Sequence, residues 1–310
     1  MLKFAVRRFG QAVLVIVAAT FFLYIGVFQL GNPFAELNEK TLPPDTQVML
    51  RAKFGMDKPF FLQYLIYLKN IFTGEFGIDF GQRREVSELI GAATPHTFRL
   101  ALLAVLISLV IGLLAGIAAA VWRDTFVDAL VTVTTVVLLC FPVLATGFLL
   151  RSLLSGWTVF PELPHPFGTE VSWLPEMLLP AITLALADLA FISRLMRASM
   201  LEVLQANYLH TARAKGLSQR RVIFKHGVRN ALIPVVNHVG INLGVLMGGA
   251  VIVESIFQYP GLGYLFVRSL RSTNNPVMLA IAVLAMITFV ALSAVVDVVG
   301  AYLDPRIRLN

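Results

Sequence analysis

The chain has 310 residues, of which 57% are hydrophobic and 14% are charged, and its mean hydropathy is +0.79. Soluble domains carry roughly 25% charged residues, so this composition excludes an ordinary soluble domain and indicates a protein of the lipid bilayer. The single cysteine, Cys140, excludes an intrachain disulfide and a cysteine-based metal site. The net charge of +7 does not indicate a nucleic-acid partner, because the placement of Lys and Arg around the membrane spans accounts for most of the excess.

Six apolar runs follow one another along the chain, and each approaches or exceeds the roughly 17 to 25 residues that a helix needs to cross the hydrocarbon core. They are residues 9–30, 100–121, 129–150, 177–193, 231–253 and 277–296. Only helices satisfy their own backbone groups in lipid, so the runs predict an all-α integral membrane fold with six transmembrane helices. The first run is too long for the apolar core of a signal peptide and is predicted to remain as the first span.

The Lys and Arg residues predict the orientation of these spans. With a cytoplasmic N-terminus, the cytoplasmic segments hold 14 Lys and Arg residues and the external loop 155–176 holds none. Both termini are therefore predicted to be cytoplasmic in a multi-pass membrane protein. The chain divides into a cytoplasmic N-terminus with helix 1 (1–30), an external module (31–97), and a five-helix core (98–310) with a cytoplasmic loop at 198–230.

The external module includes a broadly apolar stretch at residues 62–68. A fully solvated helix would not expose so much apolar surface, so this stretch is predicted to pack on the outer mouth of the protein or on a partner.

The cytoplasmic loop is basic and rich in small residues, and it lies between two membrane-length runs. Leu204, Tyr208 and Thr211 or Ala212 are predicted to share one face of a short helix. Gly216 is predicted to end that helix at a tight corner.

A second basic helix is predicted after this corner. Ser218 is suited to cap its N-terminus. The helix runs into a span that begins near Ala231, where Pro234 is tolerated in the first turn. Such an arrangement indicates a docking element rather than a simple connection.

The sequences Thr211-Ala-Arg-Ala-Lys-Gly216-Leu and Arg229-Asn-Ala-Leu-Ile-Pro234-Val resemble the coupling loop of permease subunits in binding-protein-dependent ABC importers of the di- and oligopeptide branch. The general signature of these importers is Glu-Ala-Ala, three residues, then Gly. His210 stands where the glutamate would be, so the role of that glutamate is not transferred to it.

Three further segments resemble the same branch. Gly55-Met-Asp57-Lys58-Pro59, with Gln63-Tyr64 and Gly74-Glu-Phe-Gly77, resembles the external region of its first, or B-type, permease. The other two are Gly248 to Phe257 with Pro260-Gly-Leu-Gly263, and Asp304-Pro-Arg-Ile-Arg308.

The resemblance implies a permease that forms half of a pathway for di- or oligopeptides and performs no chemistry itself. It implies a second permease subunit, two ATP-binding subunits and an extracytoplasmic solute-binding protein as partners. No cofactor is expected in this chain, since ATP and Mg would bind the partner subunits. The residues expected to couple to the ATPases are Tyr208, Thr211, Ala212, Arg213, Ala214, Lys215, Gly216 and Leu217.

The fifth run carries small and polar residues that suggest either helix packing or a face toward the second permease and the substrate pathway. Gly240, Gly244 and Gly248 form one stripe, as in close helix–helix contacts, and Asn237, His238 and Asn242 need polar partners. The pair Gly112 and Gly116 in the second run is predicted to serve packing alone.

Asp188 lies near the middle of the fourth run, where an ionised carboxylate costs several kcal/mol, so it is predicted to face protein or water or to be protonated. Arg151 is not expected to reach it, and His238 has no evident partner in the sequence. Glu254 is predicted to lie near a membrane surface.

Several other functions remain as alternatives or are excluded. The five histidines lack metal-ligand spacing, and no hydrolase motif or Walker A loop occurs. An ion-coupled secondary transporter usually shows internal repeats, which are not detected here. An intramembrane enzyme would need paired polar residues at one depth, and a permease for a non-peptide solute such as nickel also remains open.

Overall fold

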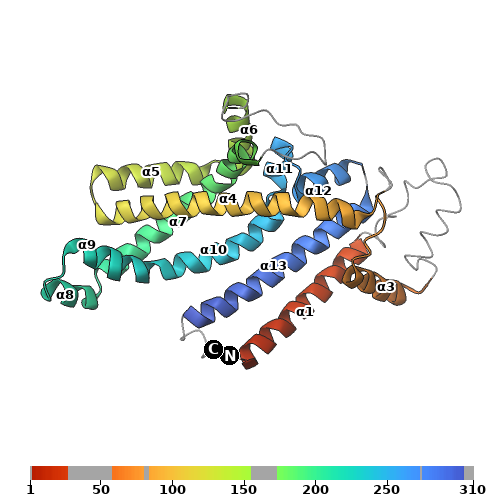
Figure 1. Cartoon of the computed structure of the whole chain (residues 1–310), viewed down its shortest axis with the longest axis horizontal. Helices are drawn as coiled ribbons and strands as arrows, with labels where there is room; N and C mark the ends of the chain where they lie inside the picture. Colours follow the sequence, from red (N-terminus) through yellow and green to blue (C-terminus); the bar gives the residue numbers. More distant parts are fainter. Residues whose placement is uncertain (1, 27–57, 80–83, 155–172, 273, 304–310) are drawn as a thin grey trace.

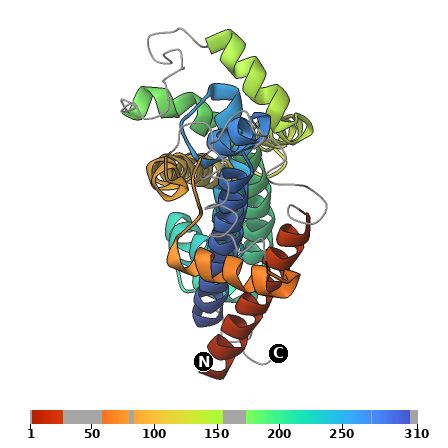
Figure 2. The same ribbon diagram turned by 90° about the vertical axis from the view of Figure 1, so that its right-hand side faces the viewer.

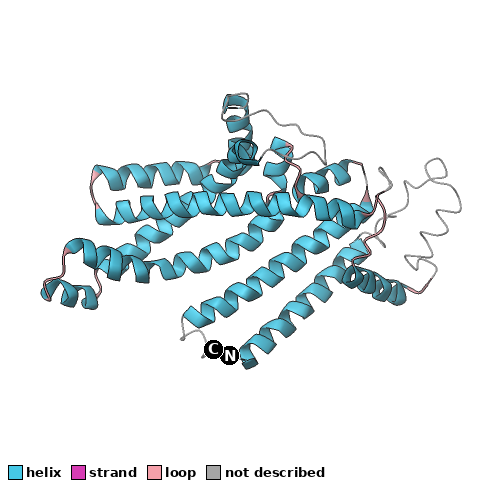
Figure 3. Ribbon diagram, in the orientation of Figure 1, coloured by secondary structure: helices cyan, strands magenta, loops and turns pink. Residues whose placement is uncertain are grey.

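The computed structural model describes residues 2–26, 58–79, 84–154, 173–272 and 274–303. Within these residues the chain is almost entirely helical, with one isolated β-bridge between Ile78 and Glu85 (Figure 3). The first half contains α1 (Leu2–Tyr24), α3 (Phe60–Thr73), α4 (Val86–Val121), α5 (Phe126–Cys140) and α6 (Val143–Leu154). The second half contains α7 (Trp173–Leu204), α8 (Asn207–Ala214), α9 (Gln219–Arg221), the π-helix η2 (Val222–Val228), α10 (Arg229–Gly249), α11 (Val251–Phe257), α12 (Leu262–Arg271) and α13 (Asn275–Leu303).

Four helices of the described residues are long and apolar enough to cross a membrane, namely α1, α4, α7 and α13. A fifth crossing is added if α5 and α6 form one bent span. Helix α10 occupies the predicted fifth run but is not among the helices that meet this criterion. The structure therefore supports an all-α membrane fold with four or five such spans, and the predicted number of six is not confirmed.

The predicted third span is not one straight helix. Its two parts, α5 and α6, meet at an angle of 101°. The break falls at Pro142, which lacks a backbone N–H, and Phe141 before it has the extended conformation (φ −85°, ψ 123°) that proline imposes on its predecessor. With 15 residues, α5 is only about 22 Å long and cannot cross a core of roughly 30 Å alone.

Helices α4 and α7 form the centre of the bundle and run parallel to each other. A Cβ atom added to Gly112 would lie 2.9 Å from the carbonyl oxygen of Leu189, and one added to Gly116 would lie 2.5 Å from that of Ser193. Only hydrogen fits at these positions, which confirms that Gly112 and Gly116 serve helix packing. Because α4 and α7 share one direction, α5 and α6 must together return the chain between them (Figure 1).

Helix α3 packs against α1, and Figure 2 shows α3 lying across it. The hydroxyl of the buried Tyr64 donates to the carbonyl oxygen of Val17 at 2.8 Å and lies 3.1 Å from the hydroxyl oxygen of Thr20. Tyr64 in the apolar stretch of the predicted external module thus packs on the first membrane helix, whereas Leu62 and Leu65 are exposed. The predicted module boundary between residues 97 and 98 falls inside α4, which already begins at Val86.

Candidate functional site

A polar cluster connects three helices of the bundle. The hydroxyl of Ser108 on α4 donates to one carboxylate oxygen of Asp188 on α7 at 2.7 Å, and Nε2 of His238 on α10 lies 2.9 Å from the other. The ring of His238 stacks on Phe191 with 4.3 Å between the ring centroids. The Asp188 side chain is only 9% exposed. Two neighbouring helices thus supply partners to a carboxylate that lies within a membrane-length helix.

The cluster confirms that Asp188 faces protein, and it corrects the expectation that His238 lacks a partner. Arg151 does not reach Asp188 and instead donates to the backbone carbonyl of Ile256. Ser108 and His238 both bind Asp188. Nucleophilic catalysis instead needs a base hydrogen-bonded to the serine, so this geometry does not support the intramembrane enzyme.

The structure describes only some of the other residues that were predicted to form a packing or pathway face on α10. Asn237 and Gly240 are half-buried, whereas the burial of Gly244 and Gly248 is outside what the structure describes. The amide nitrogen of Asn242 is buried and has no hydrogen-bond partner in the part of the chain that the structure describes. A buried amide of this kind requires a partner from water or another chain.

An ion pair that the sequence analysis missed joins α5 to α7. Nε and an Nη atom of Arg197 donate to the two carboxylate oxygens of Asp128, each at 2.7 Å. The backbone N–H of Asp124 also donates to this carboxylate at 3.1 Å. A bidentate arginine–carboxylate pair has a fixed geometry, so it sets the relative position of the two helices. The sequence signal was an acid just before one apolar run and an arginine just after another, although the two residues are 69 positions apart.

The segment from residue 207 to 217, hereafter the α8 segment, forms the predicted short helix and corner. Gly216 has φ +78°, and its N–H donates to the carbonyl oxygen of Arg213 at 2.9 Å. The N–H of Leu217 donates to the carbonyl oxygen of Ala212 at 3.3 Å. These two bonds are the Schellman pattern that ends helices at a left-handed glycine.

The α8 segment is attached to the bundle on one side and is open on the other. Leu209 is fully buried, and the amide of Asn230 on α10 donates to the hydroxyl of Tyr208 at 2.8 Å. Ala212, Arg213 and Leu217 are half-buried. The exposed positions are Asn207, Tyr208, His210, Thr211, Ala214, Lys215 and Gly216. In Figure 1 the segment lies at one end of the structure, far from α11 and α12.

Two details of this region differ from the prediction. Helix α7 ends at Leu204 and α8 begins at Asn207, so Leu204 and Tyr208 do not share one continuous helical face. Ser218 occupies the N-cap position of α9, but its side chain makes no capping hydrogen bond. The chain then enters the wide turns of η2, which the sequence analysis did not predict, and continues into α10 with Pro234 inside that helix.

A buried glutamate organises the connection between α11 and α12. The carboxylate of Glu254 accepts hydrogen bonds from the hydroxyl of Thr97 at 2.7 Å and from the N–H groups of Gly263 at 2.6 Å and Tyr264 at 3.1 Å. A Cβ atom on Gly261 would lie 2.4 Å from that carboxylate. Glu254 is fully buried, so its carboxylate does not face water. It instead holds the first turn of α12 against α4.

The described residues contain no group of three or more His, Cys, Asp or Glu side chains placed to hold a metal ion. The candidate site has three parts, which are the polar cluster among α4, α7 and α10, the projecting α8 segment, and the α11–α12 connection held by Glu254.

Comparison with known proteins gives the family. Residues 109–309 match the family described as the binding-protein-dependent transport system inner membrane component, and residues 1–101 match the N-terminal region of such membrane components. The chain is 34% identical over 318 residues to the glutathione transport system permease protein GsiC of Salmonella paratyphi A, covering 99% of each chain. The permease of the same name from Escherichia coli (strain K12) is also 34% identical, with the same coverage.

A solved structure, the crystal structure of an amino acid ABC transporter with histidines, has a similar fold, with a TM-score of 0.54. It is 15% identical in sequence and covers 70% of this chain and 94% of its own, so it supports the fold alone. The full-length relatives and the family match agree with the sequence segments that first suggested this family. The chain therefore belongs to the inner membrane permeases of binding-protein-dependent ABC importers, in the peptide branch.

Proposed function

We propose that this chain is a permease subunit of an ATP-driven importer of di- or oligopeptides and forms half of its pathway. The observation that carries the proposal is the match, over 99% of the chain, to permeases named for glutathione transport. Glutathione is itself a small peptide, so peptide import is the function that these relatives support best.

The α8 segment is the part of the chain that couples to the ATPases in this proposal. Its small exposed side chains, Thr211 and Ala214, allow a helix to enter a groove, while Lys215 and Arg213 supply charge for recognition. The segment is anchored by Leu209 and by the bond from Asn230 to Tyr208, so a movement of the segment is passed to α10. Such a rigid connection is what coupling requires.

Helix α10 is the element that links the α8 segment to the polar cluster. It continues from η2 and carries His238, which contacts Asp188. The buried, unpartnered amide of Asn242 supports a contact of α10 with the second permease or with water in the pathway. Asn237, Gly240, Gly244 and Gly248 belong to this proposed face.

The proposed assembly contains a second permease, two ATP-binding subunits that hold ATP and Mg, and an extracytoplasmic binding protein. The chain lies in a bacterial or archaeal inner membrane with both termini in the cytoplasm. Experiments must distinguish this proposed function from two others, ion-coupled secondary transport and import of a non-peptide solute such as nickel.

Reconstitution of the complete importer in liposomes tests the proposal. We expect uptake of a labelled dipeptide that requires ATP and the binding protein and persists when ionophores abolish all ion gradients. The matched control is the same importer with catalytically inactive ATPase subunits. Gradient-driven uptake without ATP, or ATP-driven uptake of nickel but not of peptides, would contradict the proposal.

The proposed topology is tested by cysteine labelling in cells. Cys140 is exposed in the structure, so a Cys140→Ser background removes its reactivity. We expect Lys69→Cys on α3 to react with a membrane-impermeant maleimide from outside, and Gln219→Cys next to the α8 segment to react only after the membrane is permeabilised. Labelling of Gln219→Cys in intact cells would reverse the orientation.

A further inference from the structure

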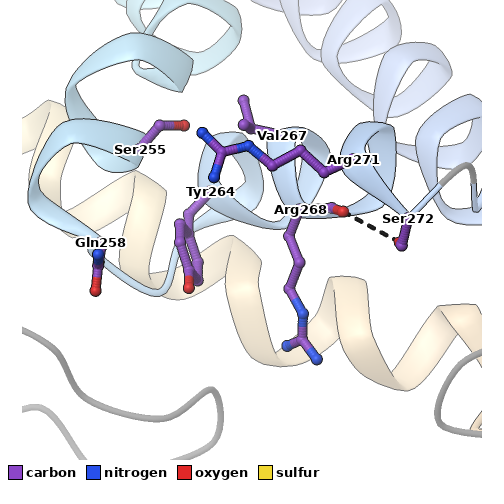
Figure 4. Close-up of a pocket in the computed structure, with 7 residues that line it drawn as sticks. All are labelled: Ser255, Gln258, Tyr264, Val267, Arg268, Arg271 and Ser272. Atoms are coloured by element: carbon purple, nitrogen blue, oxygen red, sulfur yellow. Dashed lines mark hydrogen bonds between the residues drawn. The ribbon is translucent and has the colours of Figure 1, made fainter.

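An open pocket of about 340 Å³ lies on the α11–α12 connection, away from the polar cluster and the α8 segment. It is lined by seven residues between Ser255 and Ser272 (Figure 4). Arg268 and Arg271 both line it from α12, and Figure 4 shows Arg271 extending toward Ser255 on α11. The volume lies at the lower end of the roughly 300–1,000 Å³ typical of small-molecule sites.

The lining of this pocket, hereafter the arginine pocket, is rich in hydrogen-bond donors and contains no acid. Besides the guanidinium groups of Arg268 and Arg271, it includes the hydroxyl of Tyr264 and the amide of Gln258. Within the described residues, neither arginine lies within ion-pair distance of a carboxylate. Both arginine side chains are exposed and therefore available to a ligand.

The acid that lies nearest in the chain does not serve as the counter-ion. Glu254 on α11 is fully buried, and its carboxylate accepts from Thr97 and from the N–H groups of Gly263 and Tyr264. Because these three donors occupy the carboxylate of Glu254, it does not neutralise the two arginines. The arginine pocket is thus a cationic site.

Arginines in the last turn of a helix also interact favourably with the helix dipole. That effect is small and does not require a concave site. The lining hydroxyl and amide groups, together with the absence of acids, instead match the planar carboxylate, which a guanidinium group binds through two parallel hydrogen bonds.

We propose that the arginine pocket binds the C-terminal carboxylate of the peptide as it enters the permease. This inference rests on the proposed function, which supplies the peptide. In the proposed topology α10 crosses outward, so the α11–α12 connection lies at its external end, where substrate arrives. The other carboxylate source at this surface is an acidic side chain of the binding protein.

The test measures how fast phenylglyoxal, an arginine-selective reagent, modifies Arg268 and Arg271 in the complete importer in lipid nanodiscs. Mass spectrometry follows each arginine, and Arg84 on α4, which is exposed and paired with Glu88, is the internal reference. The probes are alanyl-alanine, with a free carboxylate, and its C-terminal amide. We expect alanyl-alanine to slow modification of both pocket arginines about tenfold at ten times its half-protecting concentration, by simple mass action. The amide should leave the rate unchanged, and neither probe should affect Arg84.

Equal protection by both probes, or no protection by either, would overturn the assignment. So would protection that appears only with the binding protein and regardless of the peptide terminus, because the carboxylate would then belong to that protein. Arginines that are unreactive without ligand would show that another subunit covers the pocket, which also contradicts the proposal. If alanyl-alanine protects the arginines but the importer does not take up peptides, the proposed function is overturned and the assignment of the pocket is kept. If the importer takes up peptides but the arginines are not protected, the assignment of the pocket is overturned and the proposed function is kept.

Discussion

Gly216→Val is expected to leave the protein in the membrane but to remove peptide uptake and substrate-stimulated ATP hydrolysis together. No membrane-spanning helix is touched, and an added Cβ would meet no atom within 4 Å, so the substitution acts through the backbone alone. The φ of +78° is unfavourable for a β-branched residue, and a strained residue of this kind costs roughly 1–3 kcal/mol. The chain relieves the strain by giving up the Schellman turn, which changes the direction in which α8 projects.

Gly216→Asn is the matched control, because asparagine is tolerated in the left-handed conformation. We expect it to retain most of the uptake and ATPase activity, measured in the same reconstituted importer. If the valine variant kept normal ATPase recruitment and uptake, the assignment of the α8 segment as the coupling element would have to be withdrawn.

Gly116→Leu is expected to prevent stable assembly of the permease. The added Cβ would lie 2.5 Å from the carbonyl oxygen of Ser193 and 2.7 Å from Cβ of Met196, so α4 and α7 must separate. Overpacking of a core costs about 1–3 kcal/mol and occasionally more. The cost here should exceed that range, since the first contact is a backbone atom that cannot rotate away. Separation of the helices would also strain the ion pair of Arg197, whose backbone nitrogen would lie 3.2 Å from the new Cβ.

The control for this prediction lies on the same helix. Gly91 on α4 is exposed, and a Cβ added there would meet nothing within 4 Å. Gly91→Leu should therefore leave yield and thermal stability unchanged or raise them slightly, because leucine has the higher helix propensity. The measurement is the yield and melting temperature of the purified complex. Equal behaviour of the two variants would show that α4 and α7 are not packed as closely as the structure indicates.

The helical class and the local shape of the α8 segment were predictable because both depend on short-range chemistry. Apolar run length predicts membrane helices, and Gly216 occupies a position where its own backbone freedom decides the turn. The bend at Pro142 was also visible in principle, but the apolar composition on both sides of it concealed the break. The length of an apolar run predicts that a segment lies in lipid, but it does not predict where the helix changes direction.

The contacts between helices were not predictable from one sequence. Asp188, Ser108 and His238 lie on three separate helices, and their meeting depends on the crossing and rotation of each. The same holds for Glu254, whose burial results from the approach of Thr97 from α4. Hydropathy places such residues by depth alone, so it identified no protein partner for Glu254 or for His238.

The π-helix η2 determines how the following helix, α10, is rotated about its own axis. A residue in an α-helix advances about 100° around the axis, and a π-turn contains one residue more than an α-turn. If the seven residues of η2 wound as an α-helix instead, the whole of α10 would therefore turn by about that angle relative to the α8 segment. His238 would then face away from Asp188, and Asn230 would lose its bond to Tyr208. The wide turns of η2 thus fix how α10 is rotated relative to the α8 segment, and therefore whether His238 reaches Asp188 in the polar cluster.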